Sequence, residues 1–305
     1  MTTAAPRIFD RALHARHLGR AAGTYGRADF LKRRAAQDIV ERLEAINRRF
    51  DLAVDLGARD GTFRAALSGS PAAGRIGLLI GTDLAPAMAA RDAGARLVAD
   101  EERLPFAHGG LNLIVSALAL HWVNDLVGAL IQARLALAPD GLFIGAMFGG
   151  STLTELRQSL LAAEIEVRGG AGPRVSPFAD AGDGAALLQR AGFALPVIDT
   201  DLVTVRYDHP LRLLADLRAM GETSALVGRP RGGLSRPVLA RACEIYQQRH
   251  ADPDGRVRAS FEILTLTGWA PHPDQQQPLR PGSAKARLAD ALGVVEHKAG
   301  EKAGR

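Results

Sequence analysis

Short apolar runs alternate with helix-like segments between residues 50 and 150. TFRAALSGS and DLVGALIQARLAL have the composition of helices. Strands that are apolar along nearly their whole length are typical of parallel sheets covered by helices on both faces. The alternation therefore predicts an α/β fold with a Rossmann-like, mostly parallel sheet. The apolar runs are, in chain order, FDLAVDLG, IGLLIGTDL, ARLVAD, LNLIVSALAL and DGLFIGAMFG, the last following a turn at Pro139-Asp140-Gly141.

The flanking sequence extends this fold. FLKRRAAQDIVERLEAINRRF has apolar residues at helical spacing, which predicts an amphipathic helix before the sheet. STLTELRQSLLAAEIEVRGG is expected to form a helix that begins at a Ser or Thr cap and stops at its glycines. Two strands within ALPVIDTDLVTVRY and one in FEILTLTGWAPH complete a sheet of about seven strands, with helices over residues 208–250.

These patterns divide the chain into four parts. We expect a basic helical N-terminal arm (1–49), a cofactor-binding core (50–150), and the remainder of the sheet with substrate-side helices and loops, including a helical insertion (151–272). The last part, 273–305, is polar and compositionally biased, which predicts a mobile tail with one short helix at Ala284–Leu292.

Composition limits the classes of protein to which the chain can belong. No apolar run approaches the roughly 18 residues that span a bilayer, so no transmembrane segment is predicted. The start of the chain lacks the apolar stretch of a secretory signal, which favours a cytoplasmic protein, or a mitochondrial matrix protein if the source is eukaryotic. The single cysteine, Cys243, excludes an internal disulfide and a cysteine-based zinc cluster.

The positive charge is concentrated in the N-terminal arm. Residues 1–49 hold 11 Lys or Arg against 5 Asp or Glu; since the whole chain holds 38 against 33, the remainder carries 27 against 28. Such a surplus suits either an acidic partner or a solvated helix surface. We expect the solvated surface and no nucleic-acid partner, because only 4 of the 38 basic residues are lysines, a bias typical of GC-rich coding sequence.

The stretch DLGARDG, residues 55–61, follows the first predicted strand. Ligands of open parallel sheets bind beyond the carboxyl ends of the strands, and glycines such as Gly57 and Gly61 let the backbone turn tightly toward a ligand. Arg59 stands where such loops usually carry their middle glycine. The loop lacks the G-x-G-x-x-G of dinucleotide sites, and no Walker sequence occurs in the chain, so a pyrophosphate site is disfavoured.

Acidic residues follow the next two predicted strands. Asp83 ends the second strand, where its carboxylate can accept hydrogen bonds from both hydroxyls of a ribose. Asp100 and Glu101 follow the third strand, where a carboxylate can accept a bond from the exocyclic amine of an adenine. The alternative is that the glycines form only a strand-to-helix turn and that Asp83 caps the next helix.

In order and spacing, these elements resemble those of class I S-adenosylmethionine-dependent methyltransferases, whose loop typically reads Asp-Leu-Gly-x-Gly-x-Gly. The resemblance covers roughly residues 50–150, and Arg59 is its departure from the pattern. It implies S-adenosyl-L-methionine as the cofactor. The cofactor-binding candidates are Asp55, Gly57, Arg59, Gly61, Asp83, Leu84, Asp100, Glu101 and Leu118.

A second resemblance covers roughly residues 5–270. ALHWVND, PRVSPFAD and MGETSAL are among the stretches that resemble the complex I assembly-factor family related to the mitochondrial protein-arginine hydroxylase. The chain is similar, more distantly, to malonyl-carrier-protein O-methyltransferases. The resemblance implies a protein substrate, a subunit of respiratory complex I, and hydroxylation of an arginine as an alternative to methylation.

Candidate catalytic residues follow the fourth predicted strand. His121 can act as a general base or orient a substrate, and Trp122 can stack on a guanidinium. In the glycine-rich loop GGAGPRVSPFAD, Asp180 can pair with an incoming arginine, and Arg174 can pair with an acidic neighbour. The alternative is that the loop is held closed by a salt bridge of its own. No metal site is predicted, since the pattern His250-Ala251-Asp252 lies in a polar loop.

Three functions remain open at this point. The first is an S-adenosylmethionine-binding enzyme that modifies a protein arginine during complex I assembly. The second is methyl transfer to a small or carrier-bound carboxylate. The third is a non-catalytic assembly chaperone that keeps the cofactor pocket as a relic, a hypothesis that Arg59 favours.

Overall fold

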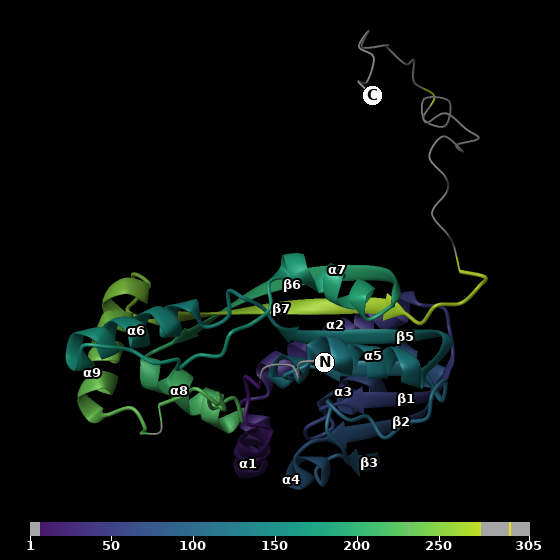
Figure 1. Cartoon of the computed structure of the whole chain (residues 1–305), viewed down its shortest axis with the longest axis horizontal. Coiled ribbons are helices and arrows are strands. Elements are labelled where there is room, and N and C mark those ends of the chain that lie inside the picture. Colours follow the sequence, from purple (N-terminus) through teal and green to yellow (C-terminus); the bar gives the residue numbers. More distant parts are fainter. Residues whose placement is uncertain (1–6, 231, 276–292, 294–305) are drawn as a thin grey trace, which may run out of the picture. The chain divides into compact units, whose positions relative to one another are not determined.

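Seven strands form one sheet in the computed structural model, which describes residues 7–230, 232–275 and 293. Their order across the sheet is β3-β2-β1-β4-β5-β7-β6 (Figure 1). Strands β1 to β5 run parallel, and β7 lies antiparallel between β5 and β6. The strands are β1 (Phe50–Leu56), β2 (Ile76–Asp83), β3 (Ala95–Val98), β4 (Leu111–Ala117), β5 (Leu137–Phe148), β6 (Ala194–Tyr207) and β7 (Val257–Trp269).

Both faces of the sheet are covered, as the unbroken apolar runs require. Neighbouring residues of one strand point to opposite faces. Ala53 of β1 therefore belongs to one apolar core, together with α2 and α3, and Val54 belongs to the other, together with α5 and α7. These helices are α2 (Phe30–Ala45), α3 (Thr62–Ser68), α5 (Leu126–Ala136) and α7 (Ala181–Arg190).

Strands β6 and β7 extend beyond the rest of the sheet. Strand β7 pairs with β5 only from Ile263 to Trp269, but it pairs with β6 as far back as Val257. Three helices gather around this extension, at the left of Figure 1, away from β1, β2 and β3. They are α6 (Thr154–Arg168), α8 (Pro210–Ala219) and α9 (Arg236–His250). The helical insertion predicted after the core therefore packs on the protruding hairpin.

The N-terminal arm includes one helix before α2. Helix α1 (Arg11–Ala21) begins at Asp10, whose side chain accepts a hydrogen bond from the backbone of Leu13. It packs on α4 (Pro86–Ala89), where Leu18 and Ala21 contact Ala85 and Met88. The short 3₁₀ turns are η1 (Tyr25–Arg27), η2 (Pro71–Arg75) and η3 (Leu120–Trp122).

The structure confirms the predicted fold class and corrects three local predictions. Residues 194–207 form one strand, β6, because pairing with β7 continues along it. Helix α6 has no Ser or Thr cap: it follows Leu153, which has a left-handed backbone (φ 56°), although Gly169 ends it as predicted. Strand β5 already begins at Leu137, so the predicted turn lies inside it, with Asp140 at φ 63°.

Residues up to Pro271 belong to one compact unit, and a second begins at His272. Within the described ranges, no helix is both long enough and apolar enough to cross a membrane. The predicted mobile tail lies outside the described residues except for 273–275 and 293, and so does its helix at Ala284–Leu292. The division into four parts stays a prediction.

Candidate functional site

The glycine loop has the backbone that its sequence predicts. Gly57 and Gly61 have positive φ angles of 68° and 82°, a region that favours glycine. A Cβ atom at Gly57 would lie 2.3 Å from the Cβ of Ala119, so the loop approaches the chain beyond β4 too closely for any side chain. The loop therefore turns sharply at the carboxyl edge of β1.

Arg59 has the same left-handed backbone, at φ 57°, and its guanidinium is buried (1 % exposed). Its Nη1 donates to Oδ2 of Asp83 at 2.7 Å, and its backbone N–H donates to the same oxygen at 3.1 Å. Burial alone would lower the pKa of Arg59, but Asp83 raises it, so the side chain stays charged. The remaining oxygen of Asp83 accepts from the backbone of Ala85 at 2.8 Å. The carboxylate expected to bind a ribose is fully engaged within the protein.

A second arginine holds the other two acidic candidates. Arg11 of α1 donates from Nη2 to Oδ1 of Asp100 at 2.6 Å, and also to Oε2 of Glu101. Its Nη1 donates to the carbonyl of Trp122 at 3.2 Å. Burial alone would lower the pKa of Arg11, but Glu101 and Asp100 raise it. Helix α1 is thus fastened across the carboxyl edge of the sheet by charged, largely buried contacts.

Lys32 of α2 was not predicted as a site residue. It is 2 % exposed, and its Nζ donates to the carbonyls of Gly57 (2.8 Å) and Ala117 (2.6 Å), which join the ends of β1 and β4. Burial lowers the pKa of Lys32 and raises that of the neighbouring Asp55 carboxyl. The available signal was a lysine on the apolar stripe of α2, four residues before Ala36.

These residues do not fit S-adenosylmethionine as they are arranged here. The backbone of the loop suits such a ligand, but Arg59 and Arg11 hold three of the four acidic candidates, namely Asp83, Asp100 and Glu101. The space above Gly57 is also filled: a Cβ there would meet Glu101 Oε1 at 3.2 Å and Arg59 Nη1 at 3.3 Å. Leu118 is buried and Leu84 half-buried at the same edge. The assignment of these residues to the cofactor stays a prediction.

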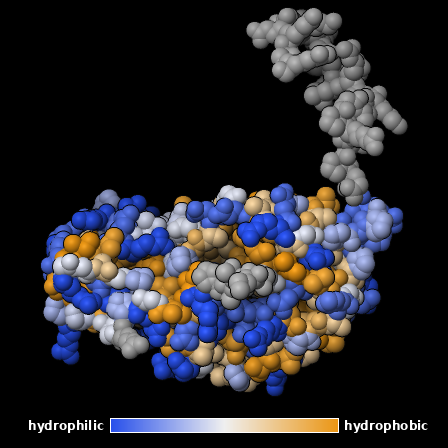
Figure 2. All heavy atoms as spheres, viewed as in Figure 1, coloured by the Kyte–Doolittle hydropathy of each residue, from blue (hydrophilic) through white to orange (hydrophobic). Residues whose placement is uncertain are grey.

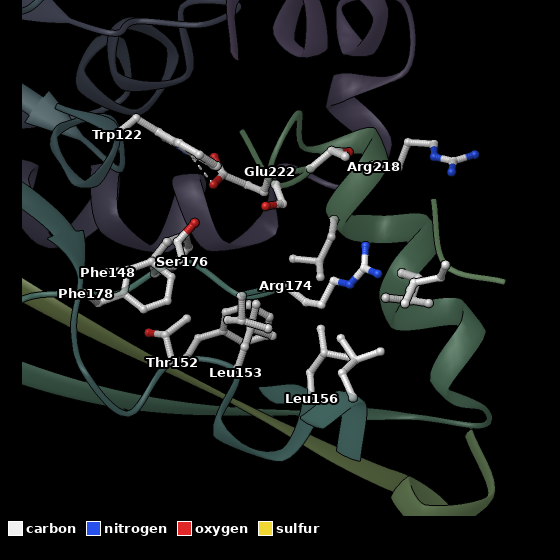
Figure 3. Close-up of a pocket in the computed structure, with 18 residues that line it drawn as sticks. Trp122, Phe148, Thr152, Leu153, Leu156, Arg174, Ser176, Phe178, Arg218 and Glu222 are labelled. Atoms are coloured by element: carbon white, nitrogen blue, oxygen red, sulfur yellow. Dashed lines mark hydrogen bonds between the residues drawn. The ribbon is translucent and has the colours of Figure 1, made fainter. Parts of the chain in front are cut away.

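An apolar cavity of about 260 Å³ opens beside this edge, between β7, α6 and α8. Figure 3 shows Trp122 and Glu222 together on one side of it, with Leu153 and Leu156 opposite. Phe148, Phe178 and Phe261 supply further aromatic wall, and Arg174 and Arg218 also reach the cavity.

Glu222 is the acid of this cavity, with a side chain that is 12 % exposed, and it was not predicted as a site residue. Its Oε2 accepts from Trp122 Nε1 at 2.8 Å, and His121 Nε2 lies 3.1 Å from the same oxygen. Burial alone would raise the pKa of Glu222, but His121, Arg59 and Trp122 lower it, so the acid is ionised. Since a carboxylate only accepts, His121 donates through Nε2. His121 and Trp122, both predicted as catalytic, thus meet at one carboxylate.

Trp122 separates the cavity from helix α1. It is 2 % exposed, and the ring of His14 stacks on it with centroids 4.3 Å apart. His14 is the third residue that sequence reasoning missed, since nothing in its spacing links it to a tryptophan more than a hundred positions away. The N-terminal arm therefore contacts both the glycine-loop edge and the wall of the cavity.

The structure separates the two substrate-side candidates. Arg174 lines the cavity and pairs with Glu164 of α6 at 2.6 Å, so it does not tie the loop through Asp180. Asp180 lies outside the cavity, immediately before α7, in a neighbouring groove of about 630 Å³ that Arg174 also lines. The assignment of Asp180 to an incoming arginine and of Arg174 to an acidic neighbour stays a prediction.

The described part of the chain contains no cluster of three His, Cys, Asp or Glu side chains arranged to hold a metal ion. In the pattern His250-Ala251-Asp252, the carboxylate pairs with Arg206 at 2.7 Å and Arg258 at 3.1 Å. Asp252 is therefore a partner of two surface arginines.

Comparison with known proteins agrees with both resemblances. A family model described as methyltransferase domain matches residues 54–145. The curated arginine-hydroxylase NDUFAF5, mitochondrial, of Mus musculus is 38 % identical over 95 % of this chain and 86 % of its own length. A malonyl-[acyl-carrier protein] O-methyltransferase of Methylovorus sp. (strain MP688) is 32 % identical, covering 97 % of each chain.

Solved structures show the same fold at low sequence identity. The YcgJ protein from Bacillus subtilis superposes with a TM-score of 0.54 at 13 % identity, covering 78 % of this chain and 98 % of that one. The chain therefore has a methyltransferase-type fold and a methyltransferase domain, and the relatives above are named as enzymes.

Proposed function

Because the chain belongs to the family of the mitochondrial arginine hydroxylase NDUFAF5, we propose that it is a methyltransferase-type enzyme that modifies an arginine of a protein substrate. We take the substrate to be a subunit of respiratory complex I, modified by hydroxylation or methylation during assembly. The proposed compartment is the cytoplasm, or the mitochondrial matrix if the source is eukaryotic. S-adenosyl-L-methionine is the proposed ligand of the glycine-loop edge, in a state in which Arg59 and Arg11 have released the carboxylates.

The ionised Glu222 at the aromatic end of the cavity carries this proposal. A guanidinium is a planar cation that stacks on aromatic rings and donates to carboxylates. Trp122 and Phe148 supply the rings, and Glu222 supplies the negative charge. Both side-chain hydrogen bonds to Glu222 end on Oε2, and among the described residues Oε1 accepts none. That oxygen remains for an incoming N–H group.

The residues around Glu222 hold it in place. Trp122 Nε1 and His121 Nε2 fix one oxygen from two directions, so the carboxylate is oriented before a substrate arrives. The apolar wall formed by Leu153, Leu156 and Phe261 excludes water, which strengthens the pairing between the carboxylate and a guanidinium. His121 is thus a positioning residue that acts through Glu222.

The same carboxylate argues against a carrier-bound carboxylate as substrate. A malonyl group is anionic, and its negative charge would face Glu222 in an apolar cavity, where like charges repel strongly. Of the two arginines that line the cavity, Arg174 is already paired with Glu164. The charge of the cavity therefore favours a cationic side chain over the substrate of the carrier-protein methyltransferases.

Mass spectrometry and binding test the proposal together. The full-length protein is incubated with complex I subunits of its source, S-adenosylmethionine as methyl donor, and dioxygen with an electron donor. The target arginine is expected to gain in mass either one oxygen atom, taken from dioxygen, or one methylene unit, taken from the methyl donor. Glu222→Gln should abolish this gain and weaken binding of an arginine-containing peptide at least about tenfold, because a charged hydrogen bond is lost. Glu166→Gln, on the exposed face of α6, is the control and should change neither.

A second function has one observation in its favour. The ion pair between Arg59 and Asp83 fills the space beside the glycine loop where a cofactor would bind. This arrangement is expected of a chaperone that keeps the cofactor pocket but does not use it. Stable binding of a complex I subunit by both wild type and Glu222→Gln, with no change in the mass of the subunit, would establish the chaperone and reject the enzyme.

A further inference from the structure

A groove of about 840 Å³ lies between the N-terminal arm and helix α8. Arg20 and Arg27 line it from α1 and η1, and Arg212 and Arg218 line it from α8. Small side chains lie between them, namely Ala21, Ala28, Ala215 and Ala219. Figure 2 shows mainly hydrophilic residues where Figure 1 places α1 and α8. The groove therefore has arginine walls and a floor of small side chains.

The arginines of this groove are exposed and lack carboxylate partners among the residues that the structure describes. Several arginines elsewhere in the described chain are paired with carboxylates, as Arg174 is with Glu164. Among the residues that line the groove, Asp216 is the one acidic side chain. Four arginines therefore face a single carboxylate.

His17 reports the positive potential of the groove. Its ring lines the groove, and its Nδ1 donates a hydrogen bond to the carbonyl of Thr223 at 3.0 Å. Burial lowers the pKa of His17, the bond to Thr223 raises it, and Arg20, Arg229 and Arg16 lower it further. Arginines of α1 and of the segment after α8 thus both contribute positive potential at the ring of His17. A surface with such a surplus of positive charge attracts anions from solution.

The groove lies beside the cavity that Glu222 lines. Arg218 and Thr223 line both, and Figure 3 shows Arg218 on the same side of the cavity as Glu222. A peptide extends by about 3.3 Å for each residue. A chain whose arginine enters the cavity therefore places its adjacent residues in the groove.

We propose that the groove binds acidic residues adjacent to the target arginine in the protein substrate. The inference rests on the proposed function, because it names the sequence context in which that function selects its arginine. Carboxylate side chains of an extended peptide match the arginines on both walls. A floor of alanines between two helices admits one extended chain, whereas a membrane surface or a nucleic-acid duplex is too broad to reach it.

Fluorescence anisotropy with synthetic peptides tests the groove. The probe is a short peptide with one arginine flanked by glutamates, and its partner has glutamine at every glutamate position. The acidic peptide should bind at least about tenfold more tightly, and added salt should reduce the difference. Arg20→Glu combined with Arg212→Glu should remove the preference. Arg190→Glu combined with Arg236→Glu, two exposed arginines outside the groove, should leave it intact.

A third peptide separates this inference from the proposed function. It keeps the glutamates and carries alanine in place of arginine. If the groove binds it through Arg20 and Arg212 while Glu222→Gln changes the affinity of no peptide, the groove stands and the arginine cavity fails. Equal affinity for the glutamate and glutamine peptides would overturn the groove. So would tighter binding of duplex DNA or anionic vesicles that the same double variant abolishes.

Discussion

Arg59 decides the state of the glycine loop. A non-glycine residue with a left-handed backbone costs on the order of 1 kcal/mol or more, and burying its guanidinium adds a desolvation penalty. The ion pair with Asp83 at 2.7 Å offsets both the backbone strain and the desolvation penalty. Nη2 of Arg59 remains buried without a hydrogen-bond partner in the described chain. The loop is therefore stable only while the carboxylate stays with the arginine.

Replacing Arg59 with glycine should open the site. Glycine adopts the φ of 57° without strain, and Asp83 Oδ2 loses the guanidinium, so that it can accept from a ribose hydroxyl. Isothermal titration with S-adenosylmethionine is expected to show binding at least about tenfold tighter than in wild type, or about 1.4 kcal/mol. The gain should disappear when Asp83→Ala is added. Arg59→Lys retains a cation beside Asp83 and should resemble wild type; equal affinities in all the variants would contradict the closed arrangement.

The sequence predicts some of these residues and misses others for one physical reason. Gly57, Gly61 and Asp83 follow strands, and the end of a parallel strand is a place that local pattern identifies. Lys32 and Glu222 reach the site from helices or loops far away in the chain, whose docking depends on tertiary packing. The sequence shows that Arg59 replaces the usual glycine, but it does not show that Arg59 pairs with Asp83.

At the scale of elements, helix α1 is held by a histidine that must remain uncharged. His14 is 1 % exposed, and its ring stacks on Trp122. Burial lowers the pKa of His14 well below its usual value, and the positive charges of Arg59 and Arg11 lower it further. In the unfolded chain the ring protonates near pH 6.5. The stability that neutral His14 contributes is therefore complete above about pH 6.5 and is lost as the pH falls below it.

Acidification should accordingly weaken the docking of α1. Between pH 7.5 and 5.5, wild type should lose about 1.4 kcal/mol of unfolding free energy per pH unit below about 6.5, relative to His14→Phe. The phenylalanine keeps the stack on Trp122 but cannot titrate. Asp55, whose pKa is raised by burial, shifts stability in the opposite sense in both proteins and cancels in the difference. Urea denaturation at each pH measures the difference in unfolding free energy between the two proteins. If the unfolding free energies of wild type and His14→Phe changed in parallel with pH, the assignment to His14 would be rejected.

The end of a helix could be predicted from the sequence where a single local interaction determines it. Gly169 ends α6 because its backbone is left-handed, as the sequence indicates. The start of the same helix was predicted wrongly: Thr154 Oγ1 donates to the carbonyl of Ser151 and does not cap the helix. Hydroxyl side chains compete between these two roles, and only the path of the chain, here turned by Leu153, decides between them.

At the scale of the whole molecule, the apolar pattern predicted the layers but not the protruding hairpin. Seven strands with two covered faces follow from the unbroken runs. The length of β6 does not, because its residues alternate between half-buried and exposed positions and resemble two short edge strands. The cavity with Glu222 exists only where this hairpin, α6 and α8 meet, so no single stretch of sequence shows it.

The arm and the sheet are held together by apolar packing more than by surface charge. Ile39 of α2 is fully buried in the core that includes β1, β4 and β5. Arg34 of the same helix pairs with Asp201 of β6, but their side chains are 56 % and 46 % exposed. Burial of a large apolar side chain contributes more than an ion pair that solvent screens.

Two substitutions on α2 compare these contributions directly. Ile39→Ala should lower the free energy of unfolding by about 2–5 kcal/mol, because it removes buried atoms and leaves a cavity. A double-mutant cycle of Arg34→Ala and Asp201→Ala should give a coupling below about 1 kcal/mol that vanishes in high salt. Chemical denaturation of the full chain measures both. A coupling as large as the effect of Ile39→Ala would mean that charge, and not the core, fastens the N-terminal arm over the site.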